Sequence, residues 1–244
     1  MLHFVQHDRR DMNIAVYSGS FNPLHIGHLA IIKHLIEEAD FDMVYLIVSP
    51  KNPLKDSISS DSARDRYNAA LAAVARHFGP LGDRGGQTVA TRGHVSGCHD
   101  RQGVTGWRAD DQREEARKSV HSVPQGTEVI KVDDIELTMP EPHYTIRTLD
   151  ALREREPDND FTFVMGADSL GDIRRWKDYT RILKEFGVAV FPRTGFDLEA
   201  LRIDLLEEDP AYKITLLNAE MVDISSTTIR EAIASGEDIS SWLM

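Results

Sequence analysis

The sequence predicts an α/β protein built on a doubly wound parallel sheet with helices on both faces. Short apolar segments, typical of strands that are buried on both faces, alternate along the chain with segments of helical pattern. Parallel neighbours need a crossover connection, so this alternation favours a parallel sheet. A hydrophobic content of 41% is enough to build a sizeable core around it.

The first half of the chain supplies two strands and two helices. Residues 13–18 (NIAVYS) form a short apolar run, and an amphipathic helix is predicted over 28–39. A second strand is predicted over 43–49, where Pro50 stops it, and a helix rich in alanine and leucine over 61–78.

The alternation resumes after residue 127. Each later strand is again a short apolar segment, and the helices end at proline or glycine. In order, we expect a strand over 128–132, a helix over 144–156, a strand over 161–166, helical segments around Trp176 and over 178–186, strands over 187–191 and 213–217, and a helix over 226–235.

A length of 244 residues favours one elaborated domain, which we place at residues 12–244. Residues 1–11 are interpreted as an N-terminal tail, with Met12 as an alternative start. Residues 82–126 hold half of the 16 glycines and show no apolar periodicity, so we interpret them as a flexible insertion. The histidines around Cys98 in this insertion match no ordinary zinc spacing, and scattered polar residues are the favoured interpretation.

The net charge of −12 argues against a general nucleic-acid binder, because affinity for a phosphate backbone needs clustered lysine and arginine. A small phosphorylated ligand needs only a local group of donors and remains compatible. With one cysteine and no apolar run of about 18 residues, we expect a cytoplasmic protein without a disulfide or a membrane partner. A homo-oligomer is possible, and the sequence leaves the oligomeric state open.

The first motif, YSGSFNPLHIGH, follows the first predicted strand. Gly19 ends that strand, where a missing side chain lets a phosphate approach the backbone. His25 and His28 are three residues apart at a helix start and can face the same point. Imidazoles donate hydrogen bonds to phosphate oxygens, and protonated ones add positive charge. The motif therefore predicts a site for phosphoryl or nucleotidyl transfer.

The second motif, ISSTTIR, begins the last predicted helix. Taken alone, Ser226 or the serine before it is best explained as a helix cap. A helix N-terminus that carries Ser226, Thr227 and Arg230 can also clamp a phosphate.

Together, GSFNPLHIGH and ISSTTIR resemble the HxGH-type nucleotidyltransferase superfamily. The segments VDDIELTMPEPHYTIRTLDALRE and FTFVMGADSLGDIRRW look like the nicotinate-nucleotide adenylyltransferase family within it. The resemblance covers the chain from Met12 onward except 82–126, and it implies a Rossmann-like, HUP-like fold. HIGH is also the signature of class I aminoacyl-tRNA synthetases, but the KMSKS signature is missing here.

The resemblance also implies a role for each motif residue. His25, His28 and Arg230 would be catalytic. The ATP-binding residues would be Ser18, Gly19, Ser20, Phe21, His25, His28, Gly166, Asp168, Ser226, Thr227 and Arg230. The nicotinate mononucleotide would contact Lys51 or Lys55 through its phosphate and Tyr144, Thr145 and Trp176 through its pyridine ring. His143 departs from the family pattern, which has a small residue there.

The expected reaction is adenylyl transfer from ATP to nicotinate mononucleotide, which gives deamido-NAD and pyrophosphate in NAD biosynthesis. Mg²⁺ would be held mainly by the ATP phosphates, with no protein side chain as a metal ligand. Two alternatives stay open. One is a sister transferase with nicotinamide mononucleotide, pantetheine phosphate or another acceptor, and the other is a non-catalytic nucleotide-binding regulator.

Overall fold

The computed structural model describes residues 12–50, 62–78, 129–219 and 226–243, all of which fall in one compact unit. Three predictions lie outside the described residues. These are the tail at 1–11, the insertion at 82–126, and the phosphate contact from Lys51 or Lys55. The single-domain boundary therefore stays a prediction.

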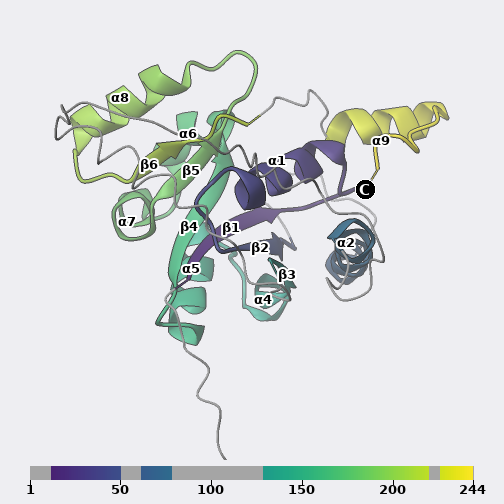
Figure 1. Ribbon diagram of the computed structural model, residues 1–244, viewed down its shortest axis with the longest axis horizontal. Helices are drawn as coiled ribbons and strands as arrows, with labels where there is room; N and C mark the ends of the chain where they lie inside the picture. Colours follow the sequence, from purple (N-terminus) through teal and green to yellow (C-terminus); the bar gives the residue numbers. More distant parts are fainter. Residues whose placement is uncertain (1–11, 51–61, 79–128, 220–225, 244) are drawn as a thin grey trace, which may run out of the picture. The chain divides into compact units, whose positions relative to one another are not determined.

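In the described part of the chain, six parallel strands form one sheet in the order β3-β2-β1-β4-β5-β6 (Figure 1). This confirms the predicted α/β class and the parallel sheet. The strands are β1 (Asn13–Gly19), β2 (Met43–Val48), β3 (Ile130–Asp133), β4 (Asp160–Gly166), β5 (Val188–Phe191) and β6 (Ile214–Leu216). β1 pairs with β2 on one side and with β4 on the other.

Helices follow each strand, as the crossover rule requires. They are α1 (Ile26–Glu37), α2 (Ala63–Phe78), α4 (Ile135–Thr138), α5 (Thr145–Arg155), α6 (Ala167–Gly171), η2 (Ile173–Arg175), α7 (Tyr179–Arg181), η3 (Ile182–Phe186), α8 (Leu198–Glu208) and α9 (Ser226–Ser235). Among the described residues, no helix is long and apolar enough to cross a bilayer.

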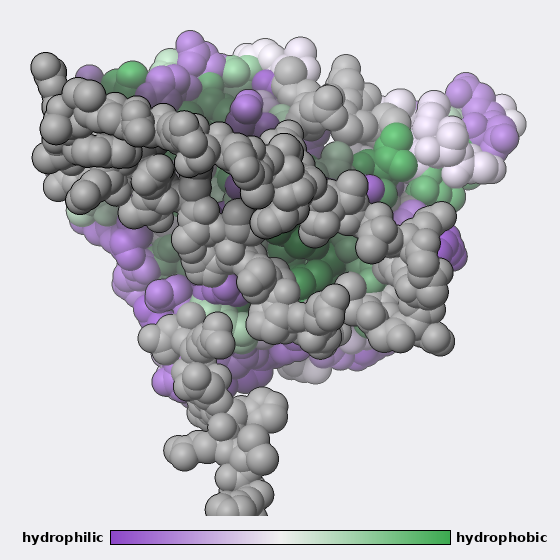
Figure 2. All heavy atoms as spheres, in the orientation of Figure 1, coloured by the Kyte–Doolittle hydropathy of each residue, from purple (hydrophilic) through white to green (hydrophobic). Residues whose placement is uncertain are grey.

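The two faces of the sheet build separate cores because side chains alternate along each strand. From β1, Ile14 and Val16 point into one core with Leu149 of α5 and Leu183 of η3. Ala15 and Tyr17, which alternate with them, point to the opposite face and join the core that α1 and α2 cover. In the view of Figure 2, hydrophilic residues are prominent at the rim and hydrophobic ones show nearer the centre. Helices on both faces confirm the doubly wound arrangement.

Sequence patterns missed α8 and α4. Apart from Leu205, the described side chains of α8 are not fully buried, so the helix carries almost no apolar stripe for a periodicity argument to find. Its start is marked instead by Asp197, whose carboxylate accepts a hydrogen bond from the Ala200 amide at 3.0 Å. α1 also begins at Ile26, two residues before the predicted start, and His25 is its N-cap residue.

Candidate active site

β1 and β4 lie side by side in the sheet, although two other strands separate them in the sequence. The strand order changes direction between them, and ligands in open α/β sheets bind beyond the carboxyl ends of strands at such a point. β1 ends at Gly19 and β4 at Gly166, so the two predicted glycines belong to adjacent strand ends. The topology therefore brings the first motif and the MGAD segment to one edge.

The loop after β1 is shaped by the ring of Phe21. Phe21 has a φ of 43°, a left-handed backbone that costs free energy for a side-chain-bearing residue. Its buried ring packs over Gly19, where an added Cβ would lie 3.1 Å from two ring carbons. Tyr17 meets the same ring edge-on at 5.5 Å between centroids. The Phe21 ring therefore leaves little room for a side chain at position 19, independently of any phosphate that approaches the backbone there.

His25 and His28 are brought together as predicted. Their ring centroids lie 3.7 Å apart. The His28 ring also contacts the Phe21 ring in an edge-to-face arrangement, with 5.1 Å between the centroids. The backbone N–H of His25 donates to Nδ1 of His28 at 3.2 Å. With Nδ1 as acceptor, a neutral His28 carries its proton on Nε2 and can donate from that atom.

Both imidazoles are neutral at pH 7. Burial, with a smaller effect of the Arg193 charge, lowers the pKa of His25 from 6.5 to about 4. Burial, the neighbouring His25 and Arg193 hold the pKa of His28 well below its usual value. The positive charge that protonated histidines would add is therefore absent in the free protein. The pair offers neutral N–H donors, and Arg193 is a nearby source of positive charge.

The end of β4 holds Gly166 and Asp168 in a tight arrangement. A Cβ on Gly166 would lie 2.4 Å from Oδ1 of Asp168 and 3.1 Å from the Phe191 ring. Nε of Arg193 lies 3.9 Å from the same Asp168 oxygen, and its guanidinium covers the Phe191 ring at 5.0 Å. Both charged side chains remain substantially exposed, so they are accessible to a ligand at this edge.

The second motif reaches the loop of the first. Arg230 donates from Nη1 to the carbonyl of Asn22 at 2.9 Å and from Nη2 to Oγ1 of Thr227 at 3.1 Å. Oγ of Ser226 lies 3.5 Å from the carbonyl of Pro23. Figure 1 shows α9 beside the start of α1. In this structure Arg230 is bonded to the segment 20–25 between β1 and α1, here called the histidine loop. The contact of Arg230 with a phosphate stays a prediction.

The residues predicted for the pyridine pocket lie at helix ends near the same edge. Tyr144 is the N-cap residue of α5, is 36% exposed, and precedes Thr145, the first residue of that helix. Trp176 follows η2 and meets the Phe163 ring edge-on at 5.8 Å, which is a core contact. In the described part, Nε1 of Trp176 and Nδ1 of His143 are buried without a hydrogen-bond partner. Their roles toward a pyridine ring stay predictions.

Two arginines at this edge were missed by sequence reasoning. Arg66 of α2 is buried and donates to the carbonyls of Ser49 and Pro50 at 2.9 Å, and to that of Ser20. It therefore ties the chain after β1 to the chain after β2. Arg66 lies among other charged residues at the start of a helix, and nothing in that local sequence indicates a buried arginine. Arg193 follows β5 within FPRTG, and its place after a strand end was the available signal.

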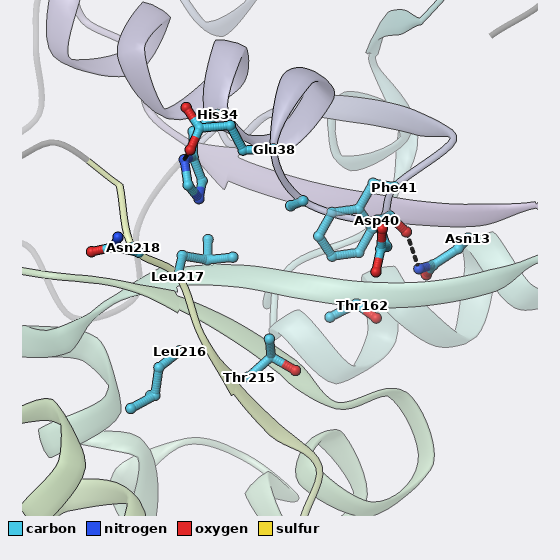
Figure 3. A pocket seen from close by; sticks show the side chains of 11 residues that line it. Asn13, His34, Glu38, Asp40, Phe41, Thr162, Thr215, Leu216, Leu217 and Asn218 are labelled. Carbon is cyan, nitrogen blue, oxygen red and sulfur yellow. Dashed lines mark hydrogen bonds and ion pairs between the residues drawn. The ribbon is translucent and has the colours of Figure 1, made fainter. Parts of the chain in front are cut away.

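A pocket of about 460 Å³ opens elsewhere, between the end of α1, the start of β1 and the segment after β6 (Figure 3). Its polar groups pair with one another: His34 lies 3.3 Å from Glu38, and the Asn13 amide donates to the Asp40 carbonyl at 2.7 Å. Carboxylates here would repel a polyanion. None of the predicted site residues lines this pocket, so it is not a candidate for the triphosphate.

The residues described here contain no group of three or more His, Cys, Asp or Glu side chains placed to hold a metal ion. Asp168 supplies one exposed carboxylate just after the end of β4, 3.9 Å from Nε of Arg193. Mg²⁺ prefers oxygen ligands, keeps several waters and needs only one or two carboxylates when phosphates supply the rest. The donor set therefore fits a magnesium ion that arrives with a nucleotide.

The family described as cytidylyltransferase-like matches residues 16–77 and 111–232, which include both histidines and Arg230. The chain belongs to the cytidylyltransferase-like family. As a member of this family, it is a nucleotidyltransferase. Two curated relatives, from Flavobacterium johnsoniae and Flavobacterium psychrophilum, are each 30% identical over 93% of this chain and 90% of their own length. Both carry the name "Probable nicotinate-nucleotide adenylyltransferase".

Solved structures share the fold of this cytidylyltransferase-like chain. The nicotinic acid mononucleotide adenylyltransferase of Plasmodium falciparum, complexed with NaAD, superposes with a TM-score of 0.62 at 17% identity. The same enzyme complexed with APC gives 0.59 at 16% identity. Each comparison covers 95% of this chain and 90% of the other. At such identities the likeness shows the fold, and it agrees with the sheet described above.

Proposed function

We propose that this nucleotidyltransferase transfers the adenylyl group of ATP to nicotinate mononucleotide, forming deamido-NAD and releasing pyrophosphate in cytoplasmic NAD biosynthesis. The observation that carries the proposal is the neutral pair His25 and His28 at the end of β1, with Arg193 as a nearby cation. The names of the relatives support the choice of acceptor.

The reaction is an in-line displacement at the α-phosphorus of ATP. The 5′-phosphate of the mononucleotide attacks, one P–O bond forms, and the bond to the leaving pyrophosphate breaks. Charge that accumulates on the phosphate oxygens is stabilised by preorganised donors, which is the largest catalytic contribution in such transfers. Nε2–H of His28 is such a donor, because its Nδ1 is already an acceptor for the His25 amide. No covalent intermediate on the protein is needed.

The triphosphate would lie over Gly19 and Gly166, between the histidines and the start of α9. Ser18, Ser20 and Phe21 would line it on the β1 side, and Ser226, Thr227 and Arg230 on the α9 side. Asp168 would lie by the adenosine. Mg²⁺, held mainly by the phosphates, would neutralise charge on the triphosphate.

Nicotinate mononucleotide would bind beside Tyr144, Thr145 and Trp176. The first amides of α5 start at Thr145, and a helix N-terminus favours a carboxylate such as that of nicotinate. Lys51 or Lys55 would receive the mononucleotide phosphate. A few donors at this position are enough to separate an acid from an amide.

The test is pyrophosphate release from Mg-ATP with nicotinate mononucleotide, nicotinamide mononucleotide or phosphopantetheine supplied in parallel. We expect release with the first acceptor at a kcat/KM at least about tenfold above the others. Release with another acceptor would retain the histidine chemistry and reject the pyridine-acid pocket. No release with any acceptor, from a folded protein that binds ATP, would favour a nucleotide-binding regulator.

A further inference from the structure

The loop that carries His25 is paired with a segment more than two hundred residues later in the sequence. The backbone N–H of Ile26, the first residue of α1, donates to the carbonyl of Trp242 at 3.0 Å. His25 itself forms an isolated antiparallel bridge with Leu243. The main chain of Trp242 and Leu243 is therefore bonded to the two residues at which α1 begins.

The same loop is held at its other end by α9. Arg230 donates to the carbonyl of Asn22 at 2.9 Å. Trp242 is itself held by a turn, in which its N–H donates to the carbonyl of Ile239 at 2.8 Å. The residues from α9 to Leu243 thus contact the histidine loop before and after its histidine, and the contacts are made to backbone atoms.

This pairing matters because the backbone position of His25 determines where both imidazoles lie. In the described structure, Nδ1 of His25 is buried and has no hydrogen-bond partner. The direction of its ring therefore depends on packing and on its backbone, which is extended at φ −140° and ψ 172°. The His25 N–H in turn orients His28 through Nδ1. Any shift of the backbone at His25 moves both imidazoles.

We infer that Trp242 and Leu243 are positioning residues for adenylyl transfer, acting through their main chain. Their pairing with His25 and Ile26 sets the start of α1 and so aligns both imidazoles toward the reacting phosphate. Neither residue touches the substrate. The inference rests on the proposed function for its kinetic consequence, while its structural content concerns the two imidazoles alone. A misplacement of about 1 Å at a catalytic group can cost roughly a hundredfold in rate.

The first experiment removes Trp242–Met244 and measures kcat and KM for ATP and the acceptor. We expect kcat to fall at least about tenfold while both KM values stay within about threefold, because the lost alignment acts on the transition state. The matched control is Ser241→Ala in the same exposed segment, which leaves the main chain intact and should stay within about twofold. A deletion variant that keeps its kcat within twofold overturns the inference.

A second variant inserts one glycine between Ser241 and Trp242. It keeps every residue but shifts the register of the pairing. An effect of this variant therefore comes from the changed pairing and not from the loss of the three C-terminal residues. Its imidazole nitrogens are followed by ¹⁵N NMR, in which wild-type His28 should show the Nε2–H tautomer. We expect the insertion to change the signals of His25 and His28 and leave that of His34 unchanged.

The two readouts distinguish the possible failures. Unchanged imidazole signals in the insertion variant overturn the positioning inference, whatever the activity. Changed signals in the insertion variant, together with a wild-type protein that releases no pyrophosphate with any acceptor, would sink the proposed function and leave the positioning intact.

Discussion

The imidazole rings of His25 and His28 lie 3.7 Å apart between centroids and are tilted by 37° to each other. Burial is the main cost of charging either ring, and the neighbouring His25 adds to that cost for His28. Both pKa values are accordingly lowered, and each ring also feels the Arg193 charge. The structure therefore has two neutral imidazoles and a separate nearby cation, a combination that the sequence motif alone did not specify.

Replacing His28 by alanine removes the Nε2–H donor of its imidazole and changes the packing of the core little. We expect kcat for pyrophosphate release to fall by about 10²–10³, since that is the usual effect of losing one such donor. Thermal unfolding should show a folded protein. His34→Ala on the same helix, where the side chain pairs with Glu38, is the control and should keep its activity. A His28→Ala protein with most of its turnover would contradict the assigned role.

The lowered histidine pKa values predict a pH-dependent stability. Between pH 6.5 and about 4 the unfolded chain binds protons on His25 that the folded chain does not, so the free energy of unfolding falls as pH is lowered through this window. The slope is at most about 1.4 kcal/mol per pH unit for each histidine.

Urea unfolding of the wild type and of Arg193→Gln over this pH window checks the prediction. Loss of the arginine charge raises both histidine pKa values, so the Arg193→Gln protein should lose less stability over the same window. Parallel curves for the two proteins would show that Arg193 does not act on the histidines.

Gly166→Ala introduces a methyl group where Oδ1 of Asp168 would be 2.4 Å away and the Phe191 ring 3.1 Å away. We expect the exposed Asp168 side chain to rotate away at little cost. The contact with the buried Phe191 ring should make unfolding easier by about 1 kcal/mol, the low end for overpacking. The KM for ATP should rise in steady-state assays. Gly171→Ala is the control, since its nearest neighbour would be an ordinary 3.6 Å away. Equal behaviour of the two variants would argue against a crowded strand end.

Arg66→Met removes a buried guanidinium whose hydrogen bonds reach three backbone carbonyls. These bonds are partly buried, and leaving such groups without a partner costs about 1–3 kcal/mol, so we expect a loss of about 1–3 kcal/mol in urea unfolding. Arg64→Met on the same helix breaks an exposed pair with Asp134 at 2.9 Å and should cost at most about 1 kcal/mol. A smaller loss for Arg66 than for Arg64 would show that the carbonyls find other partners.

Much of the fold was accessible from local patterns. Each of the six described strands overlaps a predicted apolar run, because strands buried on both faces, as the central ones are, must be apolar along their length. α8 was not predicted because its described side chains, apart from Leu205, are not fully buried. Such a helix has no periodic stripe of apolar residues in its sequence. Its capping aspartate, Asp197, was a weaker signal that pattern reading passed over.

The sequence by itself determined the α/β class, the parallel sheet and the two motifs that mark the family, because side-chain type and spacing are local properties of the chain. Tertiary structure alone decided which charges surround the histidines. Arg193 lies far from His25 in the sequence, and only the strand order and the chain path bring its charge near the histidines. The chain path likewise brings Trp242 to Ile26 and Arg66 to Ser20. The protonation state of the histidines depends mainly on burial and also on the Arg193 charge, and no local spacing encodes either.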